Sequence, residues 1–255
     1  MTAVALAPSA HRSEALGRIF HAARLHAANP WGTLVLPWLI YLAIFGLTYA
    51  IWRLIVMGAG GVQNLEPNAF MYNGGGMWVL FYMLVVAVQA MNLTFKFALG
   101  LCLTRREYYI GSALYFVFLS ILYATGITLA GLVERATDGW GLHGSFFVPF
   151  FLQDAGVAQV WFAWLALFTL FFFVGAAVAT VYVRWASNGL IAFFAILALA
   201  LVATVWALVN FDLATDVGAW ISARSLNEML GLNFLVSAAC GLMGYGMLRR
   251  ATPRA

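Results

Sequence analysis

The most marked feature of this sequence is how little charge it carries. Only 9% of its 255 residues are Asp, Glu, Lys or Arg, whereas 64% are hydrophobic. An average soluble domain carries about 25% charged residues. A water-soluble chain with so few charges could not cover its own surface, so the excess apolar side chains must face lipid. The composition therefore excludes an ordinary soluble domain and predicts an integral membrane protein.

Cysteine and lysine are also scarce, and this limits the chemistry open to the chain. The two cysteines, Cys102 and Cys240, form no CxxC pair and have no spacing typical of zinc or iron–sulfur ligands. A P-loop needs the pattern GxxxxGK[ST], in which a lysine reaches the nucleotide phosphates. The only lysine, Lys96, lies between Phe95 and Phe97. We therefore predict no metal site, no cofactor and no nucleotide site of this type in the chain itself.

Histidine gives no support for an enzyme. The four histidines are His11, His21, His26 and His143, and they are scattered along the chain. A catalytic histidine needs an orienting carboxylate and a nucleophile or metal. Asp138 is near His143 in sequence, but no HExxH or GxSxG motif accompanies the two residues. We therefore predict that the chain is not an enzyme and that His143 has a surface or interfacial role.

Long apolar runs are what the sequence has in abundance. A helical span needs about 20 mostly apolar residues to cross about 30 Å of hydrocarbon. Six such runs are present, at residues 31–53, 77–95, 108–133, 160–183, 190–210 and 230–248. Their continuous apolarity favours helices over barrel strands, which would alternate. The sequence predicts an all-α polytopic membrane protein with a tail at 1–30, a six-helix transmembrane domain at 31–250 and a tail at 251–255.

The distribution of cations predicts the orientation. If the amino terminus is inside, only Arg53, Arg135 and Arg224 of the 13 Lys and Arg residues lie outside. Cytoplasmic loops carry an excess of such cations, so both chain ends are predicted to be cytoplasmic. The net charge of +4 is then explained by the excess of cations in the cytoplasmic segments. No basic stripe is interleaved with exposed aromatic residues, so nucleic acid is not a predicted partner.

The predicted spans contain few polar side chains. No Asp, Glu, Lys or Arg occupies the middle third of any span, whereas ion-coupled carriers commonly mark their pathway with such groups. The energy for any transport is therefore expected to come from elsewhere. The amide side chains within the spans are Gln89, Asn92 and Asn233, and we predict them as possible substrate-path residues.

Before the first span, residues 13–28 have the pattern of an amphipathic helix. Leu16, Phe20 and other apolar residues can share much of one face, while Arg18 and Arg24 lie toward the other. Ser13 is the predicted N-cap of this helix. Such a helix would lie in the membrane interface with its arginines near anionic lipid headgroups. A solvated leader with partial helicity is the alternative interpretation.

A short basic segment, residues 96–107, connects the second and third spans. Thr104 and Glu107 form a T-x-x-E capping box, which predicts that the third helix begins there. Arg105 and Arg106 then lie in the first turn, where the helix dipole disfavours cations. Two explanations stay open at this point. The arginines set the topology and contact phosphate headgroups, or they dock an acidic cytoplasmic partner.

Two stretches carry a resemblance to a known family. Residues 97–114 (FALGLCLTRREYYIGSAL) and 134–141 (ERATDGWG) resemble the permease subunits of type-2 ATP-binding-cassette exporters from high-GC Gram-positive bacteria. The six-span layout with an interfacial amino-terminal helix is also similar and covers essentially the whole chain. The resemblance implies a multi-pass protein of the bacterial cytoplasmic membrane.

The resemblance also implies partners. It implies a homodimer, or a heterodimer with a sister permease, bound to two cytoplasmic ATPase subunits that hold ATP and Mg. In the family, the loop after the second span contains the coupling helix that docks on the ATPase. Here the docking residues implied in this way are Lys96, Leu103, Thr104, Arg105, Arg106 and Glu107. Residues 211–229 match a stretch that usually dips back into the membrane. The family's substrates are lipids, drugs, peptides and glycans, and nothing in this sequence selects among them.

Three other classes of function stay open. A self-contained channel or carrier would transport without any ATPase. A membrane-embedded enzyme would need a convergent set of acid, base or metal ligands, which the scattered histidines do not supply. A non-transporting interaction or immunity protein needs no motif.

Overall fold

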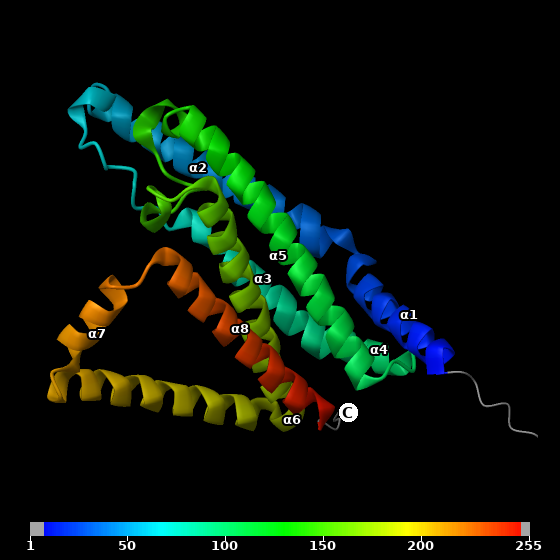
Figure 1. Cartoon of the computed structure of the whole chain (residues 1–255). Coiled ribbons are helices and arrows are strands. Elements are labelled where there is room, and N and C mark those ends of the chain that lie inside the picture. The colour runs from blue at the N-terminus through cyan, green and yellow to red at the C-terminus, as the bar shows by residue number, and fades with distance from the viewer. Residues whose placement is uncertain (1–7, 251–255) are drawn as a thin grey trace, which may run out of the picture.

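The fold is entirely helical over the part of the chain that the structure describes. This computed structural model describes residues 8–250, so the predicted tail at 251–255 lies outside the described residues. The helices are α1 (Pro8–Ala27), α2 (Leu36–Gly58), α3 (Trp78–Gln89), α4 (Phe95–Gly100), α5 (Arg105–Ala136), α6 (Val157–Asn210), α7 (Leu213–Ser222) and α8 (Leu226–Arg249) (Figure 1). Short 3-10 turns occur at Val62–Asn64, Gly75–Met77 and Phe150–Leu152, and π-turns at Trp31–Val35 and Ala90–Thr94. The predicted all-α fold class is confirmed.

Five helical stretches between residues 8 and 250 are long and apolar enough to cross a membrane. They are Trp31–Gly58, Gly75–Gly100, Arg105–Ala136, Val157–Asn210 and Leu226–Arg249. Each predicted span falls within one of these stretches, and a set of this kind is compatible with a multi-pass membrane protein. The count is five where the sequence predicts six spans, because α6 contains both the fourth and the fifth predicted span.

Helix α6 consists of two helical halves that meet at a kink. A straight helix of 54 residues would be about 80 Å long, far more than a bilayer needs. At Ala186 the backbone leaves helical geometry, with φ 56° and ψ −153°. Figure 1 shows the two halves of α6 running in different directions from a bend that lies near the carboxyl-terminal end of α8. The chain thus reverses course between the two predicted spans without a separate loop.

The core lies where α5 and the first half of α6 pack together with α3 and α2. Phe116 of α5 stacks on Phe172 of α6, with ring centroids 5.0 Å apart. Trp164 of α6 is fully buried, and its indole N–H donates to the Phe147 carbonyl at 3.3 Å. Gly175 allows α6 to approach α3 closely, since a Cβ there would lie 2.6 Å from the Leu84 carbonyl oxygen. These four helices therefore enclose a hydrophobic core.

The second half of α6 has no such interior. Its large apolar side chains are exposed around the helix, for example Ile191 (68%), Leu199 (69%) and Val209 (69%). Helix α7 and much of α8 are similarly exposed. A helix that is apolar on all sides requires an apolar environment, and a lipid bilayer supplies one.

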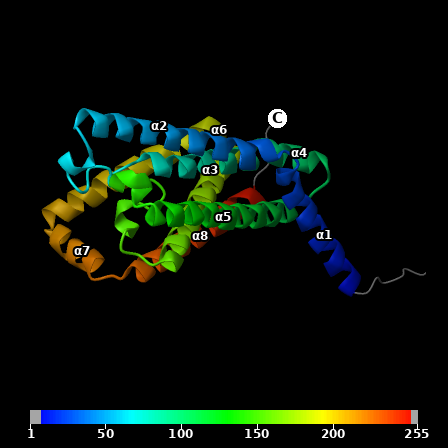
Figure 2. The same cartoon turned by 90° about the horizontal axis from the view of Figure 1, so that it is seen from above.

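Helix α1 is present as predicted, but its start and its neighbours differ from the prediction. Because the helix begins at Pro8, Ser13 lies inside it, and the prediction of Ser13 as N-cap is wrong. Ala22 is fully buried, and Gly111 of α5 lies directly against the α1 backbone at Ile19. Figure 2 shows α1 crossing at an angle to α2 and α5. One face of α1 is therefore covered by the protein itself.

Candidate partner-docking segment

The predicted docking segment, residues 96–107, is a short helix followed by a tight turn. Phe95 and Ala98 are buried and anchor α4, while Lys96 is exposed. The helix ends at Gly100, and Cys102 then adopts a left-handed conformation with φ 59°. This conformation reverses the chain, as is common after a helix. Leu103 is partly buried and packs against the hydrophobic core.

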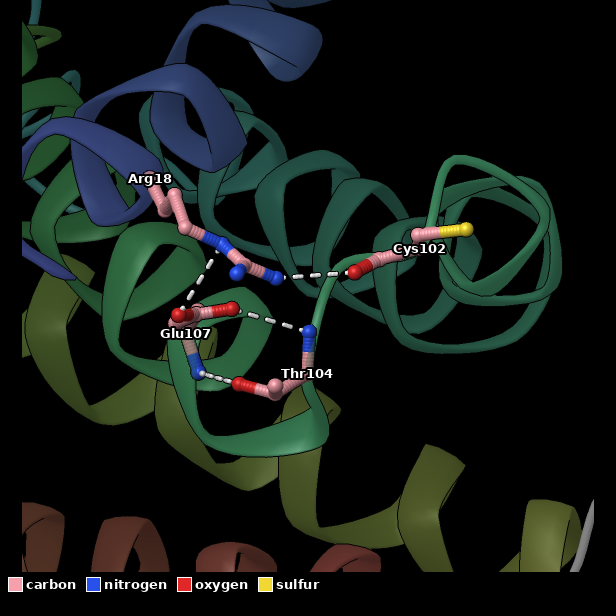
Figure 3. Close-up of polar contacts among 4 residues, drawn as sticks. All are labelled: Arg18, Cys102, Thr104 and Glu107. Carbon is pink, nitrogen blue, oxygen red and sulfur yellow. Dashed lines mark hydrogen bonds and ion pairs between the residues drawn. The ribbon is translucent and has the colours of Figure 1, made fainter. Parts of the chain in front are cut away.

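The capping box predicted at the start of α5 is confirmed. The Thr104 hydroxyl accepts from the Glu107 amide at 3.2 Å, and a Glu107 carboxylate oxygen accepts from the Thr104 amide at 2.9 Å (Figure 3). These two bonds satisfy amides that the helix itself cannot pair. They also fix the Glu107 carboxylate in one position.

Arg18 of α1 binds the same carboxylate. Its Nε lies 3.1 Å from Glu107 Oε1, and its Nη2 donates to the Cys102 carbonyl at 2.8 Å (Figure 3). The Arg18 side chain is 46% exposed, so this ion pair contributes about 1 kcal/mol or less. Its effect is geometric, because one guanidinium joins α1 to both sides of the turn. The amphipathic pattern predicts that Arg18 lies near lipid headgroups, and it does not predict the contacts with Glu107 and Cys102.

The first turn of α5 is also tied to the end of α8. Arg105 is half-buried, and its Nη1 donates to the Arg249 carbonyl at 3.3 Å. Arg106 is exposed, and no acidic side chain described in residues 16–250 forms an ion pair with it. The segment is thus held by α1 on one side and α8 on the other, while the Lys96 and Arg106 side chains are exposed.

The possible substrate-path residues do not form one site. Gln89 lies at the end of α3 and lines a cavity of about 250 Å³ between α1, α3, α5 and the two π-turns. Asn92 lies in the π-turn Ala90–Thr94 and does not line this cavity. Asn233 lies in α8, and its side-chain oxygen is buried without a hydrogen-bond partner among the described residues. The structure gives these three amides separate surroundings.

Two π-turns form part of the wall of the cavity at Gln89. The Tyr82 hydroxyl donates to the Gly32 carbonyl and the Tyr123 hydroxyl to the Thr33 carbonyl, both at 2.8 Å. In the second π-turn, the Ala90 carbonyl accepts from the Tyr108 hydroxyl at 2.5 Å. A π-turn displaces carbonyls from the regular helical pattern, and here tyrosines pair them. Neither π-turn is predicted by the residues that form it.

His26 joins α1 to α5 beside this cavity. Its Nε2 lies 2.8 Å from the Ser112 hydroxyl, which itself donates to the Tyr108 carbonyl at 2.9 Å. Since the Ser112 hydroxyl proton takes part in the bond to Tyr108, Nε2 is protonated and donates a hydrogen bond to the Ser112 oxygen. Burial lowers the pKa of His26 from 6.5 to about 4. The imidazole is therefore neutral at pH 7 when α1 is docked on α5.

The docking of α1 should weaken in mild acid. A detached His26 would have the ordinary pKa of 6.5, so docking is at full strength above pH 6.5 and weakens as the pH falls toward 4. We expect protection of the α1 amides, corrected for intrinsic exchange, to drop on the order of tenfold between pH 7 and pH 5. In His26→Gln, hydrogen exchange should show weaker but pH-independent protection. Equal pH dependence in both proteins would contradict this role.

The loop between α5 and α6 contains a second polar cluster. Glu134 is 3% exposed and accepts from the amides of Phe146, Phe147 and Val148. His143 and Asp138 lie 2.9 Å apart but are largely exposed, as predicted for a surface role. No group of three or more metal-ligating side chains occurs among those described in residues 16–250.

Comparison with known proteins does not assign the chain to a family. No family model, curated protein or solved structure matches it. The class that the structure itself defines is a helical protein whose long apolar helices are compatible with several membrane crossings.

Proposed function

We propose that this chain is the transmembrane permease subunit of a bacterial ATP-binding-cassette exporter. It forms the substrate path as a dimer and is driven by separate ATPase subunits that dock on residues 96–107. The observation that carries the proposal is the folded state of this segment. The capping box, Arg18 and the Arg105 contact with α8 hold it in one conformation, with Lys96 and Arg106 exposed.

A docking element must transmit motion, and this one contacts the elements that could receive it. It joins α1 through Arg18, α8 through Arg105 and the core through Leu103. A pre-folded segment also loses little conformational entropy when a partner binds. The chain has no P-loop, so the ATP and Mg belong to the partner.

We extend the proposal to six crossings, with both chain ends in the cytoplasm of a bacterial cell. The halves of α6 then cross separately and turn at Ala186. Figure 1 supports this layout, because the bend in α6, the end of α8 and the turn before α5 lie toward the same end of the molecule. Arg184, Arg249 and Arg105 are at that end, in agreement with the positive-inside bias. The short helix α7 is then the segment that dips back into the membrane.

This chain has an exposed apolar surface on which the second permease subunit could pack. The exposed apolar second half of α6 gives it a place to pack, and the unpaired side-chain oxygen of Asn233 is a polar group for the substrate path. Gln89 and Asn92 are the other proposed path residues.

The proposal predicts that charge reversal in the docking segment separates the chain from its ATPase. In Lys96→Glu/Arg105→Glu/Arg106→Glu, an ATP-binding-cassette ATPase should co-purify with the tagged chain at least about tenfold less than with wild type. Quantitative mass spectrometry after purification from host membranes in mild detergent measures this. The physical reason is that the three glutamates would repel the acidic partner surface to which the basic segment is complementary.

Arg53→Glu is the matched control, because Arg53 is an exposed arginine near the carboxyl-terminal end of α2 and is not part of the docking segment. It should retain the ATPase. All variants must elute as single species in size exclusion, which separates a docking defect from misfolding. Full ATPase recovery with the triple variant, or no ATPase with the wild type, would contradict the proposal.

A further inference from the structure

A groove of about 610 Å³ runs between α5 and α8. Its walls are mainly apolar and include Ala113, Leu114 and Val117 of α5 and Leu242 of α8, with Phe173 of α6 also lining it. The small residues Ala113 of α5 and Gly241 of α8 are also among the lining residues. The two helices stay joined nearby because the Tyr109 hydroxyl donates to the Gly241 carbonyl at 2.6 Å.

Two of the hydroxyl groups that line the groove are already paired with backbone carbonyls. The Ser237 hydroxyl donates to the Asn233 carbonyl at 2.9 Å, and the Tyr109 hydroxyl is used as above. Arg106 is the one cationic side chain among the lining residues. It is exposed and forms no ion pair with any side chain described in residues 16–250. The groove thus offers a long apolar wall and a single cationic group.

More positive charge surrounds Arg106. Arg105 contacts the carbonyl of Arg249, the last residue of α8, which brings the first turn of α5 beside Arg249 and the following Arg250. Glu107, the acid nearest in sequence, is bound by Arg18. The positive end of the α5 dipole lies at the same place and disfavours Arg106 unless an anion is present. A bound anion would relieve this repulsion.

We propose that this groove binds one anionic phospholipid. The acyl chain lies along Ala113, Val117 and Leu242, and the phosphate pairs with the planar guanidinium of Arg106, to which two oxygens can bind at once. Charge complementarity selects the anionic headgroup, and the position between two membrane-length helices selects a lipid over a soluble anion. The inference rests on the proposed membrane orientation, which gives the cytoplasmic leaflet. It does not depend on the ATPase.

The test is native mass spectrometry of the full chain in mild detergent with phosphatidylglycerol or phosphatidylcholine of identical acyl chains. We expect the wild type to retain one phosphatidylglycerol at concentrations where phosphatidylcholine is not retained. Arg106→Gln should weaken phosphatidylglycerol binding at least about tenfold. Arg53→Gln, the matched control, should leave it unchanged. Glycerol phosphate, which lacks the acyl chains, should not displace the lipid.

A second variant tests the apolar wall. Ala113→Trp fills the groove and leaves Arg106 in place, so it should reduce binding of phosphatidylglycerol while the ATPase still co-purifies. Unchanged lipid binding in Arg106→Gln, or displacement by glycerol phosphate, would overturn the lipid site. Loss of the ATPase in Lys96→Glu with retained lipid concerns docking alone, because Lys96 does not line the groove. The two proposals can therefore fail separately.

Discussion

Replacing Glu134 with alanine should unfold the loop between α5 and α6 and lower the stability of the whole chain. Its carboxylate accepts from the amides of Phe146 at 2.8 Å and of Phe147 and Val148 at 3.0 Å. The indole N–H of Trp140 donates to the same carboxylate at 3.2 Å. Three successive amides thus surround one buried carboxylate, in the manner of an anion-binding nest.

The expected effect is large because the donors are buried. Phe146 and Phe147 are each 2% exposed, so in Glu134→Ala their amides would lose the acceptor without gaining water. Each unpaired buried donor costs about 1–3 kcal/mol, which gives a total on the order of 5 kcal/mol. We expect the unfolding midpoint in detergent to fall by ~10 °C or more. Circular dichroism measures the midpoint, and limited proteolysis of residues 137–156 locates the change.

Two further variants make the Glu134 experiment specific. Glu134→Gln keeps one acceptor oxygen but directs an NH2 group at an amide, so its midpoint should fall between those of wild type and Glu134→Ala. Asp138→Asn changes an exposed carboxylate in the same loop, with 78% of the side chain accessible, and should alter stability by about 0.5 kcal/mol or less. A Glu134→Ala protein as stable as Asp138→Asn would show that the amides find other partners.

The sequence predicted those features that depend on local chemistry. Continuous apolar runs identified every membrane-length helix, and the spacing of Thr104 and Glu107 predicted the start of α5. A capping box involves four consecutive residues, so its signal is contained in the sequence itself. Composition was sufficient for the helical fold class, because unpaired backbone groups are too costly in lipid.

The features that were missed depend on contacts distant in sequence or on backbone geometry. Arg18 and Glu107 come from different helices, and nothing near either residue indicates the other. The bend in α6 occurs at Ala186, which carries no sequence signal for positive φ, so separation into two spans came only from the polar residues around it. For Glu134, the sequence showed only an acid in a polar loop and not the amides that surround it.

Adding a single methyl group at Gly111 should release α1 from α5. A Cβ at this position would lie 2.6 Å from the Ile19 carbonyl oxygen, 2.7 Å from Ala22 Cβ and 3.0 Å from the Ala23 amide nitrogen. Two of these atoms belong to backbone, which cannot rotate away as a side chain can. The clash is relieved only if α1 moves, because Gly111 lies on the continuous helix α5. We expect protection of the α1 amides to fall about 10- to 100-fold in Gly111→Ala.

The consequences of Gly111→Ala should extend to the docking segment. Once α1 moves, Arg18 can no longer hold Glu107 and the Cys102 carbonyl, and His26 loses Ser112. Hydrogen exchange should therefore increase in residues 100–104 as well as in α1, and the pH dependence caused by His26 should disappear. If a folded segment is needed for docking, ATPase recovery should fall although no docking residue has changed.

Gly246→Ala is the matched control for this experiment. Gly246 lies in α8, and a Cβ there would meet no atom within 4 Å. The substitution should leave α1 and residues 100–104 fully protected and stabilise α8 by up to about 1 kcal/mol, since alanine is the better helix former. Unchanged α1 exchange in Gly111→Ala would mean that α1 is not held on α5 by this close contact. Increased exchange in α1 without any change in residues 100–104 would separate α1 from the docking segment, and Arg18 would then not be what keeps that segment folded.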